Sequence, residues 1–363
     1  MQHRFVIVGY GTMGFTHINK LKALSIDVAG VVDIDPVAER EATEAGLRVY
    51  AGLDEALADE SVDLVFVCTP NEAHRPIALA ALAAGKHVVT EKPAMLNSAE
   101  IEEVMAAARR AGRQFFVHQN RRWDEDYLVI KSLHDQQVLG EVSFIETRVD
   151  GSRGIPGDWR RDPNRGGGML LDWGVHLVDR LLLMVPSPVR TVYARLSHAS
   201  GAPVEDGFSI WLTFANGVEA LAACTTDNFA PRAKFHLTGR RGTAVVEDWQ
   251  MHGKIVRRVE EAEPDAVPIV AGKGMTKTMA PRIVDYSKLA KIQDNVEVLP
   301  LPRIESDIND FYRNVIAVVE GTAPRAVSNE SVLRCMRVLE AARLSHRDDR
   351  VVDLSASDRY LDA

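Results

Sequence analysis

The chain has 363 residues, of which 46% are hydrophobic and 26% are charged, so it is long enough for about two globular domains with substantial cores. Its formal net charge of -8 argues against broad binding to nucleic acids or anionic membranes, and we expect neither as a partner. No apolar stretch approaches the roughly 20 residues that a membrane-spanning helix needs.

The three cysteines, Cys68, Cys224 and Cys335, are far apart in the sequence. Because they form no CxxC pair, we predict neither a disulfide framework nor a zinc site, and a reducing compartment fits them best. The first residues lack the pattern of a signal peptide, so we expect a cytoplasmic protein.

Short apolar runs alternate with helical patterns over the first third of the chain. This alternation predicts an α/β domain with a doubly wound parallel sheet, covered by helices on both faces. We expect this domain to occupy residues 1–120. Its predicted strands cover residues 5–8, 28–33, 64–68, 87–90 and 115–117, and its predicted helices cover residues 14–24, a stretch that begins at Asp35–Pro36, residues 76–84, and a stretch from Asn97–Ser98 to Gly112.

Strands dominate much of the rest, and hairpin signals connect them. Residues 208–214 alternate apolar and polar side chains, and Asn216–Gly217 separates them from the apolar run 218–224. Successive hairpins predict an α+β domain over residues 121–363 with a large, open, mainly antiparallel sheet. Other predicted elements are a strand over 142–149, a turn over 239–242, and helices over 123–133, from Gly166–Gly168 to about 184, over 304–319 and over 328–345, whereas residues 260–302 receive no assignment.

A glycine-rich motif follows the first predicted strand and opens the first predicted helix. In this context Gly9 permits a tight turn, Gly11 lets the backbone approach a pyrophosphate, and Gly14 allows close packing of helix and strand. Phosphates would then lie at the helix N-terminus, whose N–H groups and dipole favour them. The alternative is a tightly packed turn that binds nothing. The full motif is Gly9–Tyr10–Gly11–Thr12–Met13–Gly14.

Asp33, at the end of the second predicted strand, selects between cofactors. A carboxylate there can accept hydrogen bonds from the ribose hydroxyls of NAD and would repel the extra phosphate of NADP. Because Ile34 follows it, no adjacent basic side chain would neutralise that phosphate, so we predict NAD.

Lys92 follows the strand predicted over 87–90, within Thr90–Glu91–Lys92–Pro93. That position is at the carboxyl edge of the sheet, where ligands bind in open α/β folds. An ammonium there could polarise a carbonyl or stabilise an alkoxide. A solvated loop lysine is the alternative.

Asp172 and His176 are four residues apart on the helix predicted after the glycines, so they share one face. An imidazole titrates near neutral pH and can accept a proton from a hydroxyl, and a nearby carboxylate can orient it. Asp179 lies three residues further on. The alternatives are a surface ion pair and a metal site formed by the three side chains. We favour no metal, because no further His or Cys lies at ligand spacing.

These motifs together resemble the glucose–fructose oxidoreductase, inositol dehydrogenase and rhizopine-catabolism family, written Gfo/Idh/MocA. They occur in the family's order and spacing up to about residue 180, whereas the later part fits only as a pattern. The matching elements are GYGTMG with His17 three residues on, Asp33, Cys68–Thr69–Pro70–Asn71 with His74, Ala84 to Val88, Glu91–Lys92–Pro93, Asn120–Arg121–Arg122, and GGGMLLDWGVH from Gly166 to His176.

The resemblance implies a role for each matching residue. Lys92, Asp172 and His176 correspond to a catalytic trio beside the nicotinamide and the substrate. Positions implied to contact the nicotinamide half of the cofactor are Thr69, Pro70, Asn71, His74 and Glu91, with Lys92 beside them. Positions that would contact substrate are Asn120, Arg121, Trp159 and Arg160, although a tryptophan packed between the domains is an equal alternative at 159. Departures at Gln119 and Ala94–Met95–Leu96 weaken inference about the substrate.

We therefore expect an NAD-dependent dehydrogenase that transfers a hydride between nicotinamide and a secondary alcohol or ketone of a sugar, inositol or related polyol. His176 would take the hydroxyl proton, Lys92 would stabilise the alkoxide, and Asp172 would orient the substrate or His176. Three alternatives stay open: a sugar oxidoreductase or redox-assisted glycosidase that retains its cofactor, a non-catalytic NAD-bound sensor, and an enzyme with an enoyl- or dihydrodiol-type substrate. The open sheet face predicts self-association, and the family resemblance implies a homodimer or homotetramer.

Overall fold

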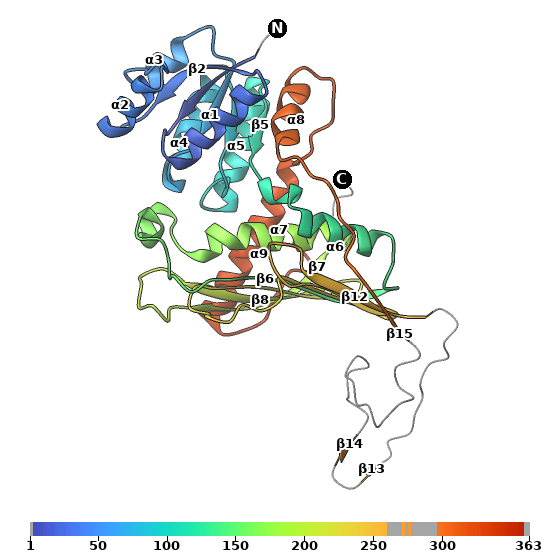
Figure 1. Ribbon diagram of the computed structural model, residues 1–363. Helices are drawn as coiled ribbons and strands as arrows, with labels where there is room; N and C mark the ends of the chain where they lie inside the picture. Colours follow the sequence, from blue (N-terminus) through green and yellow to red (C-terminus); the bar gives the residue numbers. More distant parts are fainter. Residues whose placement is uncertain (1–2, 260–270, 273–274, 277–295, 359–363) are drawn as a thin grey trace.

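The computed structural model describes residues 3–259, 271–272, 275–276 and 296–358 of the chain. These residues form two bodies, one above the other in Figure 1, and each body is built around its own sheet. One hydrophobic core lies around the first sheet and a second core around the other. The predicted fold class, an α/β part followed by an α+β part with a mainly antiparallel sheet, is confirmed.

The first sheet has five parallel strands in the order β2-β1-β3-β4-β5. All five predicted strands are confirmed, as is the cap of the second helix, where the Asp35 carboxylate accepts a 2.9 Å hydrogen bond from the Val37 N–H. The strands are β1 (Arg4–Val8), β2 (Asp27–Val32), β3 (Leu64–Val67), β4 (His87–Thr90) and β5 (Phe115–Val117), and the helices are α1 (Thr12–Ala23), α2 (Pro36–Glu44), α3 (Leu53–Ala58), α4 (His74–Ala83) and α5 (Ser98–Ala111).

The parallel arrangement brings the candidate cofactor residues to one edge of this sheet. All five strands run in the same direction, so the segments that follow them leave from the same edge. The glycine turn follows β1, Thr69 comes shortly after β3, and Lys92 comes shortly after β4. The order also reverses between β1 and β3, which is the topological switch point where α/β sheets bind ligands.

The second sheet has nine strands in the order β15-β12-β11-β10-β6-β9-β8-β7-β16. Only the β6–β9 pair is parallel among the described neighbours, and the predicted hairpins at 216–217 and 239–242 are confirmed. The strands are β6 (Val142–Asp150), β7 (Val189–Ser197), β8 (Gly207–Phe214), β9 (Glu219–Thr225), β10 (Phe235–Gly239), β11 (Gly242–Val246), β12 (Gly253–Arg258), β15 (Val296–Leu299) and β16 (Val352–Asp353).

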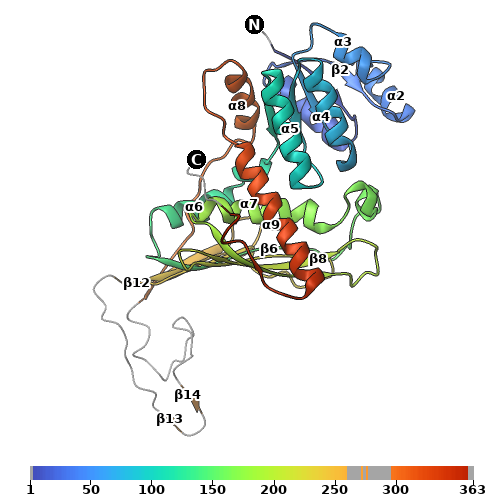
Figure 2. The same cartoon turned by 180° about the vertical axis from the view of Figure 1, so that it is seen from behind.

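Helices α6 (Glu125–Asp135), α7 (Val175–Met184) and α9 (Asn329–Asp348) lie on the sheet face that points toward the first body (Figure 1). Figure 2 shows α9 running from the first body down to this sheet. Accordingly, Val332 and Met336 of α9 belong to the first core, whereas Cys335 and Leu339 belong to the second. One helix therefore packs into both cores and ties the two bodies together.

Helix α8 (Asn309–Val319) also packs on the first body, although it comes near the end of the chain. Its Phe311, Tyr312 and Val315 are buried in the first core. The sequence pattern predicts that this helix begins at residue 304, five residues too early. Tertiary contacts explain the difference, because the Ile304 N–H donates to Glu125 at 3.1 Å and the Asp307 carboxylate accepts from the Asn309 N–H at 2.9 Å.

The helix predicted after the glycine loop is present, but it is not regular. Its first turn, Leu170–Gly174, is π-helical, and α7 continues from Val175. A π turn is wider than an α turn, and such turns are frequent at functional sites. Leu170 packs in the second core and Leu171 in the first, so the turn lies between the two bodies.

The stretch 260–302, which received no assignment, lies mostly outside the described residues. Within it, β13 (Ala271–Gly272) pairs with β14 (Met275–Thr276), and β15 extends the second sheet next to β12. Among the described helices, none combines the length and the apolar character needed to cross a bilayer.

Candidate active site

The glycine turn has the geometry that a dinucleotide requires. A Cβ added to Gly14 would lie 2.0 Å from the Gly9 carbonyl oxygen, and one added to Gly9, where φ is +98°, would lie 2.8 Å from the Cys68 carbonyl oxygen. Gly11, in contrast, has no atom within 4 Å of such a Cβ. The turn is therefore closed on its inner side and open at Gly11, and Thr12 begins α1 directly beside it.

The surroundings of Asp33 also fit a bound dinucleotide. Its carboxylate accepts hydrogen bonds from the backbone N–H groups of Tyr10 at 2.5 Å, Ile34 at 2.7 Å and Asp35 at 2.9 Å. A carboxylate has about four acceptor positions, so one remains for a ribose hydroxyl. The side chain of Ile34 is 98% exposed and adds no charge next to the carboxylate. These residues fit a dinucleotide with an unphosphorylated ribose.

The segment after β3 contacts both the loop Gly166–Gly168 and the loop that carries Lys92. The Asn71 side chain donates to the Gly166 carbonyl at 2.9 Å, and the ring nitrogens of His74 lie 2.9 Å from the Pro93 carbonyl and 3.0 Å from the Thr69 carbonyl. The Thr69 hydroxyl is buried and has no hydrogen-bond partner among the described residues. A bound group would satisfy such a hydroxyl.

Glu91, for which the resemblance implies contact with nicotinamide, is buried, and its carboxylate is engaged within the protein. One carboxylate oxygen lies 2.7 Å from both His17 Nε2 and His118 Nδ1, and the other accepts the Lys92 N–H at 3.1 Å. Burial alone would raise the pKa of Glu91, but the two imidazoles hold this pKa well below its usual range. Glu91 therefore supports the backbone of Lys92 as an ionised group.

The partners of Glu91 extend this network to α8, because the His17 Nδ1 atom lies 2.7 Å from the Tyr312 hydroxyl. His17, Glu91 and His118 are also the one group in the described part of the chain whose donors could hold a metal ion. Their contacts have ordinary hydrogen-bond lengths, so we interpret them as a hydrogen-bond network. Sequence reasoning noted His17 but missed His118 and Tyr312, since only the tertiary structure brings Tyr312 to His17.

Lys92 and Asp172 meet across the two bodies. The Lys92 ammonium lies 2.6 Å from an Asp172 carboxylate oxygen and 3.1 Å from the Asp172 carbonyl, and each side chain is 18% exposed. Burial would raise the pKa of Asp172, but the charges of Lys92 and Arg160 outweigh it and lower this pKa. An ion pair that keeps some solvent access can exchange its partners for a hydroxylated ligand.

His176 lies one helical turn beyond Asp172, and its side chain is buried. Its Nδ1 atom has no hydrogen-bond partner among the described residues. Burial, followed by the nearby charges of Lys92, Arg121 and Arg180, lowers the pKa of His176 well below its ordinary value. The imidazole is therefore neutral at neutral pH, which is the form that can accept a proton.

Asp172 and His176 are four residues apart, but the described contacts include no hydrogen bond between their side chains. The Asp172 carboxylate is paired with Lys92 and lies 3.7 Å from Arg160. Asp172 lies in the π turn Leu170–Gly174 and His176 lies in α7, so the two residues do not share one regular helix. Asp172 thus orients the Lys92 ammonium in this structure.

The residues expected to contact substrate lie on two short 3-10 turns, Asn120–Trp123 and Trp159–Arg161. The Arg121 guanidinium stacks 4.4 Å from the ring centre of Trp173 and donates to Asp124 at 2.8 Å, and its Nε is buried without a partner among the described residues. The Arg160 guanidinium lies 4.6 Å from the ring centre of Trp159. Arg121 thus approaches His176 through Trp173, whose ring centre lies 5.9 Å from the His176 ring, and Arg160 lies 3.7 Å from Asp172.

Asp179, in contrast, does not join Asp172 and His176. It forms a buried ion pair with Arg122, with N···O distances of 2.6 Å and 2.8 Å. The described residues that could hold a metal ion are His17, Glu91 and His118, and Asp179 is not among them. The alternative of a metal site formed by Asp172, His176 and Asp179 therefore lacks the required geometry.

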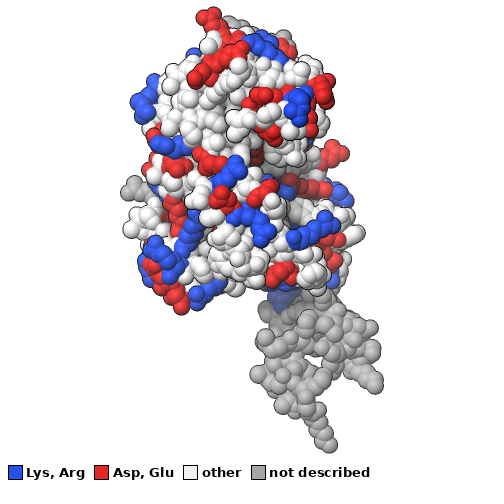
Figure 3. Space-filling view, turned by 90° about the vertical axis from the view of Figure 1, so that its left-hand side faces the viewer, with Lys and Arg blue, Asp and Glu red and all other residues white. Residues whose placement is uncertain are grey.

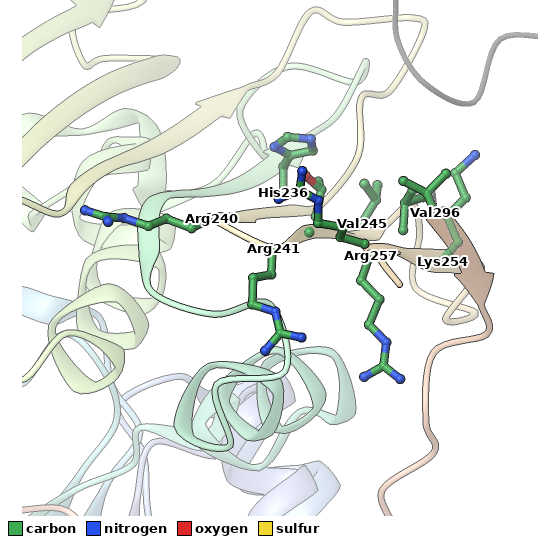
Figure 4. Close-up of a pocket in the computed structure, with 11 residues that line it drawn as sticks. His236, Arg240, Arg241, Val245, Lys254, Arg257 and Val296 are labelled. Carbon is green, nitrogen blue, oxygen red and sulfur yellow. The ribbon is translucent and has the colours of Figure 1, made fainter. Parts of the chain in front are cut away.

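A hollow of about 510 Å³ lies elsewhere, over the strands β10, β11, β12 and β15 (Figure 4). No catalytic candidate lines it. Its basic lining residues are His236, Arg240, Arg241, Lys254, Arg257 and Arg258. Within the described residues, Arg240 pairs with Glu141 at 2.9 Å and Arg257 with Glu297 at 2.5 Å. On the face shown in Figure 3, basic and acidic side chains are intermixed where the two bodies meet.

Comparison with known proteins agrees with the two-body arrangement. Residues 3–119 match the oxidoreductase family with an NAD-binding Rossmann fold, and residues 127–245 match the GFO/IDH/MocA C-terminal domain. The uncharacterized oxidoreductase YdgJ of Escherichia coli is 36% identical over 188 residues, which cover 52% of this chain and 54% of that protein. The scyllo-inositol 2-dehydrogenase (NADP(+)) IolW of Bacillus subtilis is 25% identical over 355 residues, which cover 96% and 95%.

Solved structures match over nearly the whole chain. An NAD-binding protein from Listeria innocua is 38% identical, with a TM-score of 0.86 and 97% of both chains covered. GenD2 from gentamicin A biosynthesis, in complex with NAD, is 28% identical, with a TM-score of 0.77 and coverage of 98% of this chain and 97% of that one. With the open glycine turn and the Lys92–Asp172 pair, these matches show that the chain belongs to the Gfo/Idh/MocA family of oxidoreductases and carries an NAD-binding Rossmann domain.

Proposed function

We propose that this protein is an NAD-dependent dehydrogenase that acts on a secondary alcohol of a sugar, an inositol or a related polyol. The observation that carries the proposal is the 2.6 Å contact between the Lys92 ammonium of one body and Asp172 of the other, four residues before the buried His176. The scyllo-inositol dehydrogenase among the relatives supports a polyol substrate.

The residues that would hold the cofactor are Gly9, Gly11, Gly14, Asp33 and Thr69, and the cofactor would supply the hydride acceptor. The neutral imidazole of His176 accepts the hydroxyl proton of the substrate, since burial and nearby cations keep it unprotonated. The Lys92 ammonium donates a hydrogen bond to the same oxygen and stabilises the alkoxide as the proton leaves. Asp172 holds the ammonium in position, and the Glu91 carboxylate holds the Lys92 backbone.

Reduction of NAD by purified protein tests the proposal directly. We expect at least one member of a panel of inositols, aldoses and sugar acids to give a steady increase in NADH absorbance. If the protein binds NADH but oxidises no member of the panel, the sensor alternative replaces the proposal. If it is purified with cofactor already bound and that cofactor does not exchange, the alternative of a retained-cofactor oxidoreductase replaces it.

Replacing Asp33 by serine should reduce the preference for NAD over NADP by roughly tenfold, because the like-charge repulsion of the second phosphate is lost. The measurement is a binding titration of NADH and NADPH, followed by their nicotinamide fluorescence. Asp27→Ser is the matched control, since Asp27 is an exposed acid at the start of the same strand. A wild-type protein that already prefers NADPH would show that Asp33 does not select the cofactor.

A further inference from the structure

Trp249 is a half-exposed tryptophan on the turn between β11 and β12, and the sequence motifs do not include it. The turn is ordered by Asp248, whose carboxylate accepts from the N–H groups of Gln250 and His252, each at 3.0 Å. Trp249 nevertheless leaves 51% of its surface exposed. A large exposed aromatic side chain on a well-ordered turn is suited to contact a ligand.

Ring contacts connect Trp249 to the catalytic candidates. Its ring centre lies 6.2 Å from that of Trp173, and Trp173 in turn lies 5.9 Å from the His176 ring. The Arg121 guanidinium lies near both indoles, 4.4 Å from the centre of Trp173 and 5.1 Å from that of Trp249. Trp249 therefore belongs to the surroundings of His176, although it is 73 positions away in the sequence.

A chain of buried and half-buried ion pairs holds this cluster in place. The Lys234 ammonium lies 3.0 Å from the Trp249 ring centre and 2.5 Å from the Asp126 carboxylate. Arg180 lies 3.7 Å from Asp126 and 2.5 Å from Asp124, and Asp124 also pairs with Arg121. Because each cation in the chain has a carboxylate partner, the two cations that contact Trp249 are fixed before any substrate binds.

We propose that Trp249, together with Trp173 and Arg121, forms a subsite for the ring of a cyclic sugar or inositol whose reacting hydroxyl lies at His176 and Lys92. This inference rests on the proposed function and names its substrate class more closely. An indole presents a rigid apolar surface to the C–H face of a ring, and the unpartnered Nε of Arg121 can donate to a ring hydroxyl. A flexible open-chain alditol has no such face and must lose more conformational freedom to bind.

The test compares cyclic and open-chain substrates in two variants of the intact protein, Trp249→Ala and Trp249→Phe. The probes are the best cyclic member of the inositol and aldose panel and an open-chain alditol, sorbitol, both with NAD. We expect Trp249→Ala to lower kcat/KM for the cyclic substrate by roughly tenfold, mainly through KM, and to change kcat/KM for sorbitol little. Trp249→Phe should retain most of the cyclic preference, since it keeps an aromatic face.

Trp211→Ala is the matched control. Trp211 is 42% exposed on β8, and its ring contacts Phe144, so its loss removes an exposed tryptophan outside the catalytic cluster. It should leave KM for both substrates unchanged. The dissociation constant of NADH should be the same in all variants, because the described contacts of Trp249 are with substrate-side residues.

The outcomes separate the subsite at Trp249 from the proposed function of the protein. If wild type oxidises a cyclic polyol and both Trp249 variants keep its kcat/KM within twofold, the subsite is disproved while the proposed function stands. If the variants lose NADH affinity or sorbitol activity in equal measure, Trp249 supports the fold and the subsite is again disproved. If wild type oxidises and binds no polyol at all, the proposed function fails and the subsite fails with it. Should Trp249→Ala not fold, Trp249→Leu with Trp211→Leu as its control gives the same comparison, because leucine removes the aromatic face and keeps an apolar side chain.

Discussion

Replacing Lys92 by alanine should lower kcat for polyol oxidation by about 10²- to 10⁴-fold, the usual contribution of one positioned acid–base or alkoxide-stabilising group. The physical reason is the loss of the only described ammonium that lies within hydrogen-bond distance of Asp172. The dissociation constant of NADH should change little, because the glycine turn and Asp33 are separate from this contact. Steady-state kinetics with NAD and a fluorescence titration of NADH measure the two quantities.

Two further variants separate the charge of Lys92 from its volume and from general surface effects. Lys92→Met keeps a long side chain without the ammonium and should be as inactive as Lys92→Ala. Lys131→Ala removes a lysine that pairs with Asp135 on the surface of α6 and should be fully active. A Lys92→Ala protein that binds NADH normally and keeps full turnover would refute the catalytic assignment.

Replacing His176 by asparagine should lower kcat by a similar factor, about 10² to 10⁴, and should also change the pH dependence. The base form of His176 is the neutral imidazole. Because its pKa lies well below the ordinary 6.5, this form persists as the pH falls through 6.5. Oxidation by wild type should therefore stay constant through that pH and decline only in more acidic solution. In His176→Asn this acidic decline should disappear.

The measurement is kcat/KM for polyol oxidation from about pH 4 to 8, which extends below the range in which ordinary histidines titrate. His134→Asn is the control, since His134 lies on α6 next to Asp135 and has no contact with the catalytic cluster among the described residues. An acidic decline that is the same in His176→Asn and in wild type would assign the titrating group elsewhere.

Local sequence signals account for most of the first body. The alternation of apolar strands and amphipathic helices, the Asp35 cap and the terminating Gly112 act over a few residues each, so they can be read without knowledge of the fold. The same holds for the hairpin at 216–217. The short helix α3 was missed because six residues are too few for a clear helical period.

The candidate site could be predicted as separate pieces. Lys92 was recognised by its place after a strand, and Asp172 and His176 by their spacing and by the family resemblance. Their arrangement was not predictable, because Asp172 lies in a π turn where the sequence predicts a regular helix, and because its partner Lys92 comes from the other body. Trp249 carries no motif at all, and only its ring contacts with Trp173 reveal its position.

By itself, the sequence determined the fold class, the dinucleotide turn and the identity of the candidate catalytic side chains, because each of these depends on residues close together in the chain. Only the tertiary structure decided that Glu91 is buried beneath Lys92, that Lys92 pairs with Asp172 80 positions away, and that Tyr312 reaches His17 295 positions away. Such contacts form when distant segments pack into shared cores, and no periodicity within a single segment encodes them.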